Sequence, residues 1–185
     1  MISELLTETR GRMGKTIGDL TRSLSTIRTG RASVHLLDHV VVNYYGTRTP
    51  INQLATLHVP EPSLITVQPW DISQIGEIEK AILASDLGVH PSNDGRLIRL
   101  PIPPLTQERR EELARKVGRI AEEHRTALRS LRRDSNDTLK KALKEKEISE
   151  DEEYRALGEV QTVTDELVRR VDELAAQKEK EILEV

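Results

Sequence analysis

The sequence of 185 residues contains no cysteine and no phenylalanine, and its aromatic residues are only Trp70, Tyr44, Tyr45 and Tyr154. Without cysteine there can be neither a disulfide framework nor a thiolate that binds metal or acts as a nucleophile. This usage is compatible with a reducing compartment, so we expect a cytoplasmic protein. Four aromatic residues are too few for an interleaved platform on which the bases of single-stranded RNA could stack. Any contact with RNA must therefore be made mainly to phosphates.

Long apolar runs are also absent. No stretch approaches the roughly 20 apolar residues that a membrane-spanning helix needs, and the N-terminus lacks a positive segment followed by an apolar one. We therefore expect neither secretion nor contact with a membrane. The five histidines are scattered, and no nucleophile, base and orienting group occur at a recognisable spacing. The sequence predicts a protein that is not an enzyme and that uses no cofactor or metal.

An overall positive charge is missing too. The formal net charge is −3, which by itself argues against a simple nucleic-acid-binding protein. The charges are distributed unevenly, however. Residues 105–147 carry thirteen Lys or Arg against nine Asp or Glu, whereas residues 148–185 carry five against twelve. Basic and acidic surfaces are therefore separated along the chain.

Apolar residues recur at helical spacing in three segments. The first covers residues 2–27. The second has Thr106 as its N-cap and continues for about 40 residues, or ~60 Å. The third opens with Ser149 and Glu152 in a capping box. The short break at 144–149 requires an antiparallel hairpin of the second and third helices, on which the first must pack to bury its apolar stripe.

The segment between the first helix and this hairpin follows a different pattern. It contains three strand candidates and one amphipathic helix, separated by turn residues. These elements are residues 40–45, 64–67 and 96–100 for the strands and 75–82 for the helix. The predicted class is therefore α+β, with an elongated antiparallel three-helix bundle and a small inserted α/β domain. The bundle would comprise residues 1–30 and 105–185, and the insert residues 31–104.

Two linkers join the predicted domains. Residues 28–31 contain a permissive glycine, whereas residues 101–106 form a stiff, extended, proline-rich chain. That combination predicts a hinge. Its residues would be Thr29, Gly30, Pro101, Pro103 and Pro104.

Four arginines of the second helix share one face, because they occupy positions i, i+4, i+7 and i+8. They are Arg125, Arg129, Arg132 and Arg133. At roughly 100° per residue this face lies away from the apolar stripe and is predicted to face solvent. An ordinary solvated surface is the alternative. No acid interrupts residues 125–133, however, and unpaired guanidinium groups suit a phosphate backbone.

Two further arginines, Arg28 and Arg31, flank the glycine of the first linker. Cations at this point could bind RNA, or they could interact with the C-terminus of the preceding helix. On local grounds the two interpretations are about equal.

Seven blocks in order along the whole chain carry a further signal. They are Ile27–Ala32, Tyr44–Gln53, Gln68–Asp71, Ile78–Ile82, Ser85–Gly88, Leu100–Arg110 and Leu131–Asp134. In this order and at this spacing they resemble the ribosome recycling factor family.

The resemblance implies an L-shaped molecule that approximates transfer RNA in outline. It also implies a translation factor that acts after termination. With elongation factor G, which hydrolyses GTP, such a factor separates the post-termination 70S ribosome into subunits and frees messenger RNA and deacylated transfer RNA.

The family's contacts with large-subunit ribosomal RNA centre on arginines of the rod. They correspond here to Arg129, Arg132 and Arg133, with Arg28, Arg31 and Arg110 near the hinge. Arg125 is added by the charge pattern alone. The alternative from another class is a non-catalytic coiled-coil scaffold, in which the apolar stripes would pair between chains. A scaffold predicts a stable oligomer, whereas a recycling factor is expected to be a monomer.

Overall fold

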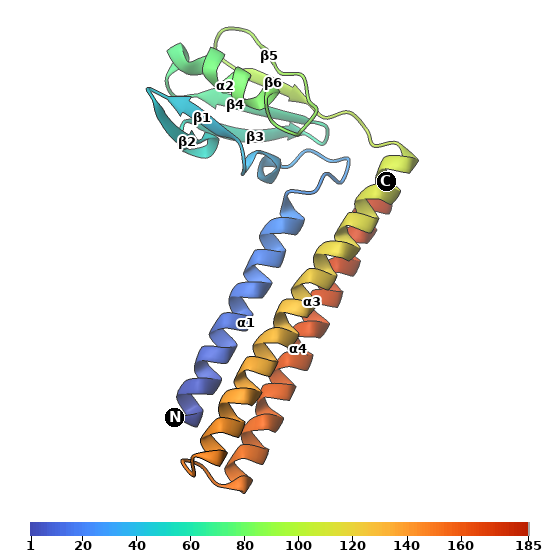
Figure 1. Cartoon of the computed structure of the whole chain (residues 1–185). Helices are drawn as coiled ribbons and strands as arrows, with labels where there is room; N and C mark the ends of the chain where they lie inside the picture. The colour runs from blue at the N-terminus through green and yellow to red at the C-terminus, as the bar shows by residue number, and fades with distance from the viewer. Residues whose placement is uncertain (185) are drawn as a thin grey trace. The chain divides into compact units, whose positions relative to one another are not determined.

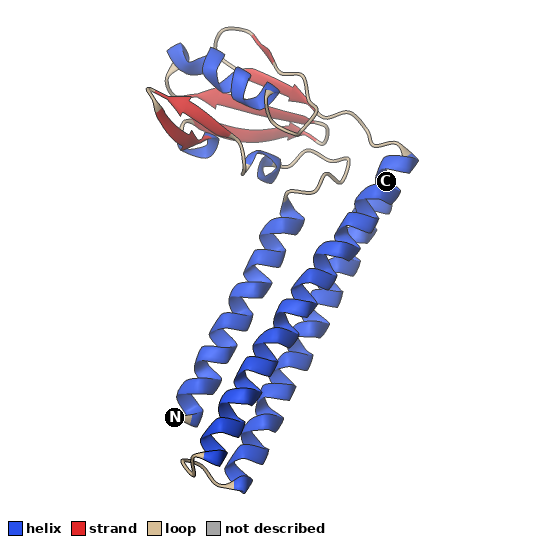
Figure 2. Ribbon diagram, viewed as in Figure 1, coloured by secondary structure: helices blue, strands red, loops and turns tan. Residues whose placement is uncertain are grey.

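A computed structural model describes residues 1–184. The chain forms two compact units, one of Met1–Leu24 with Ala114–Lys180 and the other of Ser25–Leu113 with the residues from Glu181 onward. The first unit is helical and the second contains the strands (Figure 2). The predicted α+β class is confirmed. The predicted domain boundaries at residues 31 and 104 stay a prediction. The two compact units divide after Leu24 and after Leu113.

Three long helices pack side by side in the first unit (Figure 1). They are α1 (Ile2–Ser25), α3 (Gln107–Lys144) and α4 (Glu150–Leu183). With 38 residues, α3 agrees with the predicted length. Thr9 of α1 contacts Ser135 of α3, and Arg12 contacts Asp134. Residue numbers rise along α1 while those of the contacted residues fall along α3, so these two helices are antiparallel. Helices α3 and α4 are also antiparallel, because a short loop joins them.

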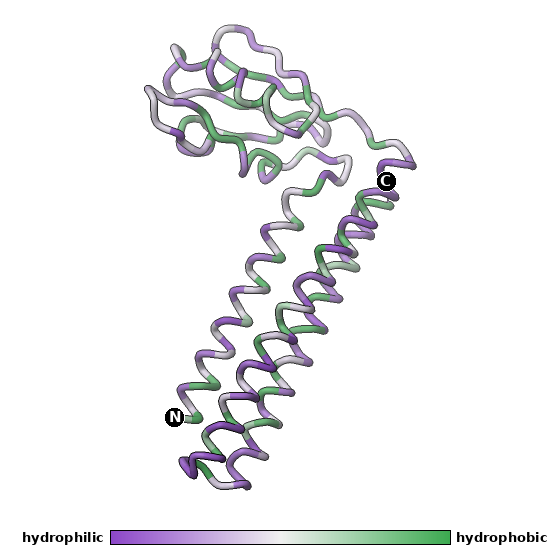
Figure 3. The backbone as a smooth tube through the Cα atoms, in the orientation of Figure 1, coloured by the Kyte–Doolittle hydropathy of each residue, from purple (hydrophilic) through white to green (hydrophobic). Residues whose placement is uncertain are grey.

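The apolar stripes of the three helices are buried within one chain, and Figure 3 shows the hydrophobic residues that recur along each helix. Met13, Leu20, Leu128, Leu139 and Val160 are all fully buried. Burial of a large aliphatic side chain contributes roughly 1.5–3 kcal/mol, so these residues supply much of the stability of the unit. Pairing between chains, which the scaffold alternative needs, is not required to bury the stripes.

The two predicted helix starts are confirmed by their hydrogen bonds. The Arg109 N–H donates to Thr106 Oγ1 at 3.2 Å, which makes Thr106 the N-cap of α3. At the start of α4 the Ser149 N–H donates to Glu152 Oε2 at 2.8 Å, and the Glu152 N–H donates to Ser149 Oγ at 3.3 Å. This reciprocal pair is a capping box, which satisfies two backbone donors that the helix itself leaves free.

The end of α3 turns the chain back toward α4 through a left-handed residue. Lys146 has φ 61°, and its N–H donates to the Leu143 carbonyl at 3.0 Å. The next N–H, of Glu147, donates to the Ala142 carbonyl at 2.9 Å. These two bonds form a Schellman motif, in which glycine usually occupies the left-handed position.

The second unit is built on a four-stranded antiparallel sheet in the order β3-β4-β6-β5, with a separate β1-β2 hairpin. The strands are β1 (Val41–Tyr44), β2 (Thr47–Pro50), β3 (Ala55–Glu61), β4 (Leu64–Pro69), β5 (Ser92–Asn93) and β6 (Ile98–Pro101). The predicted strands correspond to β1, β4 and β6. The sequence pattern does not indicate β2, β3 or β5.

Helix α2 (Ile75–Leu83), which the sequence predicted, lies over the sheet (Figure 2). It buries Ile78 and Ile82 in the same core as Ile65, Val67 and Leu100. Strand β4 is central in the sheet, so Ile65, Thr66 and Val67 are buried in succession. Strand β6 alternates buried Ile98 and Leu100 with exposed Arg99 and Pro101. The second unit therefore has a hydrophobic core of its own.

Candidate nucleic-acid interface

Arg125 is the most strongly held of the four arginines predicted on α3. Its Nε donates to Asp172 Oδ1 of α4 at 2.7 Å, and its Nη1 donates to Glu122 Oε2 at 2.8 Å. Its side chain is only 22% exposed. Burial acts against the charge, but the bonds to Asp172 and Glu122 outweigh it and raise the pKa of Arg125 above its ordinary value. Arg125 therefore links α3 to α4 and has little capacity left for a ligand.

The other three arginines are held less firmly than Arg125. Arg129 lies 3.4 Å from Glu122 Oε1, with its side chain 49% exposed. Arg132 is half-buried and its Nη1 lies 3.4 Å from Gln161 Oε1 on α4. Arg133 is exposed and has no hydrogen bond or ion pair within residues 1–184. Contacts at 3.4 Å are weak, so the guanidinium groups of all three remain able to bind a polyanion.

The prediction that the four arginines are unpaired and face solvent is wrong for Arg125, which is paired and half-buried, and in part for Arg129 and Arg132. The acid that binds Arg125 and Arg129 is Glu122, one turn before the acid-free stretch. The remaining partners, Asp172 and Gln161, come from α4. The side chain of arginine is long enough to reach across the groove between neighbouring helices.

The sequence could have revealed only part of this set of partners. Glu122 precedes Arg125 by three residues and Arg129 by seven, so helical geometry alone places all three on one face. Asp172 and Gln161 could not be found in this way. Their proximity depends on the register of α4 against α3, and the periodic pattern leaves that register open.

The two arginines of the first linker differ in exposure. Arg31 is exposed and has no hydrogen bond or ion pair within residues 1–184. Arg28 is half-buried, and its Nη2 donates to the Pro103 carbonyl of the second linker at 2.6 Å. Burial and the charge of Arg109 lower the pKa of Arg28 from its ordinary value. Arg28 thus connects the two linkers, whereas Arg31 is free to bind a ligand.

Arg110 is buried, with 6% of its surface exposed. Its Nη1 donates to the Ile182 carbonyl at 3.1 Å and its Nε to the Leu105 carbonyl at 3.3 Å. The guanidinium therefore joins the start of α3 to the end of the chain. This position favours a structural role over a phosphate contact, and the contribution of Arg110 to RNA binding stays a prediction.

The predicted hinge residues differ in how firmly the backbone holds them. Pro101 is the last residue of β6, and the next N–H, of Ile102, donates to the Ser63 carbonyl at 2.7 Å. Pro103 and Pro104 are exposed and lie outside any helix or strand. Gly30 has φ 83°, a left-handed conformation that favours glycine. Thr29 lies beside it in the first linker. Thr29, Gly30, Pro103 and Pro104 therefore lie outside any helix or strand, although the Pro103 carbonyl is bound by Arg28.

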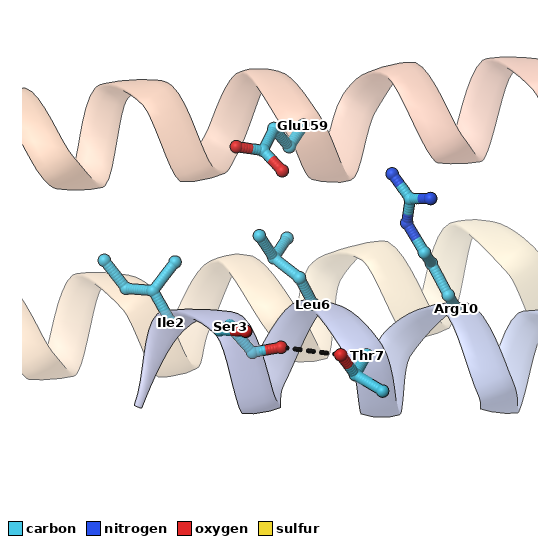
Figure 4. Close-up of a pocket in the computed structure, with 6 residues that line it drawn as sticks. All are labelled: Ile2, Ser3, Leu6, Thr7, Arg10 and Glu159. Atoms are coloured by element: carbon cyan, nitrogen blue, oxygen red, sulfur yellow. Dashed lines mark hydrogen bonds between the residues drawn. The ribbon is translucent and has the colours of Figure 1, made fainter.

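A shallow groove of about 560 Å³ lies elsewhere, between α1 and α4. Figure 4 shows Leu6 and Arg10 pointing from α1 toward α4, and Glu159 pointing back from α4. None of the predicted arginines lines this groove. Within residues 1–184 no three acidic or histidine side chains gather as metal ligands would. In the same range no helix is long and apolar enough to span a bilayer.

Comparison with known proteins finds relatives along the whole chain and the same fold in solved structures. A family model described as ribosome recycling factor matches residues 20–183. The ribosome-recycling factor of Desulforapulum autotrophicum is 53% identical over 185 residues, which cover all of both chains. This chain belongs to the ribosome recycling factor family. The resemblance carried by the seven sequence blocks is thereby confirmed.

Solved structures of ribosome recycling factors share the fold. A solution structure of one such factor is 38% identical, with a TM-score of 0.80, and the match covers 100% of this chain and 98% of the other. The factor of T. thermophilus has been placed, together with the elongation factor G of E. coli, in models bound to the E. coli post-termination complex. It is 49% identical, with a TM-score of 0.69 and 99% of both chains covered.

Proposed function

We propose that this chain, a monomer, acts with elongation factor G to separate the post-termination ribosome into its subunits and to release messenger RNA. The observation that carries the proposal is the full-length match to recycling factors, one of which occurs with elongation factor G on a post-termination complex. That relative shares 49% of its residues with this chain over 99% of both lengths. A match over so much of the chain favours a shared partner as well as a shared fold.

The proposed contact with large-subunit ribosomal RNA is the face of Arg129, Arg132 and Arg133. Arg133 is free and the other two have only long contacts, so all three can donate to phosphate oxygens. Arginine presents planar donors that match two oxygens of a phosphate at once. Arg31 would extend this contact from the first linker.

The acidic charge of α4 supports the placement of RNA on the arginines of α3. Helix α4 is acidic, with four acids in its first turn alone. An acidic helix is repelled by the phosphate backbone, whereas α3 carries eight arginines. RNA is therefore expected to approach the α3 side of the helical unit.

The proposed mechanism needs no catalytic site in this chain. Elongation factor G hydrolyses GTP, and this protein transmits the resulting movement. For that purpose it needs a stiff helical unit, a surface that binds RNA and a hinge between its parts. Gly30 with Thr29, and Pro103 with Pro104, are the residues proposed to allow rotation, while Arg28 holds the two linkers together through the Pro103 carbonyl.

The proposal is tested by replacing Arg132 with alanine and measuring binding to purified large subunits. A hydrogen bond to a charged group contributes about 1.5–3 kcal/mol, so we expect at least about tenfold weaker binding. The slope of log affinity against log salt should fall by about 1, because one phosphate contact is lost. Subunit splitting with elongation factor G and GTP should fall in parallel.

The matched control is Arg169→Ala, because Arg169 is an exposed arginine of α4. It removes the same charge from the acidic helix, on which no RNA contact is proposed, so its affinity should stay close to that of the wild type. Equal affinities of the two variants would contradict the proposed RNA-binding face. Failure of the wild-type protein to split ribosomes would contradict the function itself.

A further inference from the structure

One carboxylate on α3 lies between two of the arginines. Glu122 places Oε2 at 2.8 Å from Arg125 Nη1 and Oε1 at 3.4 Å from Arg129 Nη1. The two arginines differ in what else they bind. Arg125 is 22% exposed and also bound to Asp172, whereas Arg129 is 49% exposed and has Glu122 as its sole partner within residues 1–184.

The carboxylate offers these guanidinium groups the same chemistry as a phosphate. Each presents oxygen acceptors with negative charge, and arginine binds both in a similar planar geometry. We propose that Glu122 competes with an RNA phosphate for Arg129: it holds this side chain in the free protein and releases it when RNA binds. This inference rests on the proposed function, in which Arg129 belongs to the RNA-binding face.

The contacts indicate which arginine can change partner. The Arg129 contact is long and exposed, and a pair of this kind is easily replaced by a closer anion. Arg125 is held by Asp172 at 2.7 Å through two of its nitrogens, so it stays in place when Glu122 moves. Glu122 therefore lowers the affinity of Arg129 for phosphate while Arg125 continues to join α3 and α4.

The competition favours RNA that presents several phosphates in register. A single phosphate binds only Arg129, and the loss of the Glu122–Arg129 contact cancels part of the binding free energy. An RNA surface that also engages Arg132 and Arg133 gains contacts for which no acid competes, because Arg132 contacts only a neutral amide and Arg133 is free. Glu122 thus makes the face selective for a shaped RNA partner.

The test compares Glu122→Gln with Glu123→Gln in binding to purified large ribosomal subunits. Glu123 is the neighbouring residue, is exposed, and has no hydrogen bond or ion pair within residues 1–184. Both variants change the net charge by the same amount, and glutamine keeps the helix propensity of glutamate. We expect Glu122→Gln to bind about two- to fivefold more tightly than Glu123→Gln. Glu122→Ala should bind more tightly in the same way.

The same pair of variants is then measured with Arg129→Ala. Without Arg129, Glu122 has no RNA-binding arginine for which it can compete. Glu122→Gln should then bind no more tightly than Glu123→Gln. An advantage that persists without Arg129, or equal affinities of the two glutamine variants, would overturn the competition. If Arg129→Ala alone binds like the wild type, Arg129 is no RNA contact and the proposed face fails together with this inference. If Arg129→Ala weakens binding but the glutamine variants are equal, only this inference fails.

Discussion

Single arginines in this molecule are distinguished by what they already bind. Arg125 binds two carboxylates and Arg110 binds two backbone carbonyls, and neither is well exposed. Arg31 and Arg133 are exposed and free within residues 1–184. A charge near the linkers or on α3 is therefore insufficient evidence of RNA binding, because some guanidinium groups hold the fold together.

Arg110→Ala tests the structural role at the level of one side chain. The substitution removes two hydrogen bonds and leaves the Leu105 and Ile182 carbonyls without these donors. Because the side chain is buried, we expect a loss of about 3 kcal/mol in the free energy of unfolding, measured in urea. Arg133→Ala, the exposed control, should change it by less than about 0.5 kcal/mol. A similarly small change in Arg110→Ala would show that its buried bonds contribute little.

Sequence periodicity was sufficient to find the residues of the arginine face but not their partners. That Arg129, Arg132 and Arg133 share a face follows from 3.6 residues per turn. The binding of Arg125 to Asp172 depends on two helices meeting at one register. The burial of Arg110 depends on the end of the chain returning to the start of α3. Neither contact has a local signature in the sequence.

At the scale of elements, the helices were predictable and several strands were not. The caps of α3 and α4 have local sequence signatures, and both were found. Strand β3 lies at an edge of the sheet, contains Pro60 and has a shift of register between His58 and Glu61. An edge strand with one exposed face lacks a continuous apolar pattern. Strand β5 has only two residues and is formed by its pairing with β6.

The C-terminus of α3 offers a test of an element boundary. Lys146 occupies the left-handed position of the Schellman motif at φ 61°. Glycine adopts this conformation without the steric cost that a Cβ imposes, although it gains freedom in the unfolded chain. We expect Lys146→Gly to raise the free energy of unfolding by about 0.5–1 kcal/mol, measured in urea.

The control for this substitution is Lys140→Gly, inside the same helix. Lys140 is exposed, and glycine in a helix interior costs about 1 kcal/mol. The two lysine-to-glycine changes should therefore have opposite signs. Destabilisation by both would show that the turn after α3 does not favour a left-handed residue.

At the scale of the whole molecule, a net charge of −3 is compatible with RNA binding because the charges are segregated. Helix α4 has an excess of acids over bases, and two of its polar residues bind arginines of α3. Salt screens charges beyond about 8–10 Å, so the local surface decides binding more than the total does. The acidic helix thus contributes an internal ion pair with α3, and in the proposed function it also directs RNA to the α3 side.

Deletion of residues 31–104 tests the division of labour between the two compact units. The helical unit has a core of its own, with Met13, Leu20, Leu128 and Leu139 fully buried. The cut ends already meet, because a Cβ built on Gly30 would lie 3.9 Å from Leu105 Cγ. A short glycine and serine loop can therefore close the gap with little loss of entropy. We expect a helical protein with one cooperative transition in urea, followed by circular dichroism.

This deletion variant should bind large subunits but should not split ribosomes, because the proposed joint and the unit it moves are gone. Binding would be measured by co-sedimentation, and splitting by light scattering with elongation factor G and GTP. The same deletion combined with Arg132→Ala serves as control and should lose binding, which shows that the helical unit still binds through its arginine face. Splitting at the wild-type rate by the deletion variant would mean that the helical unit alone separates the subunits. The sheet unit would then have no part in transmitting the movement of elongation factor G, and the two linkers would be connectors only.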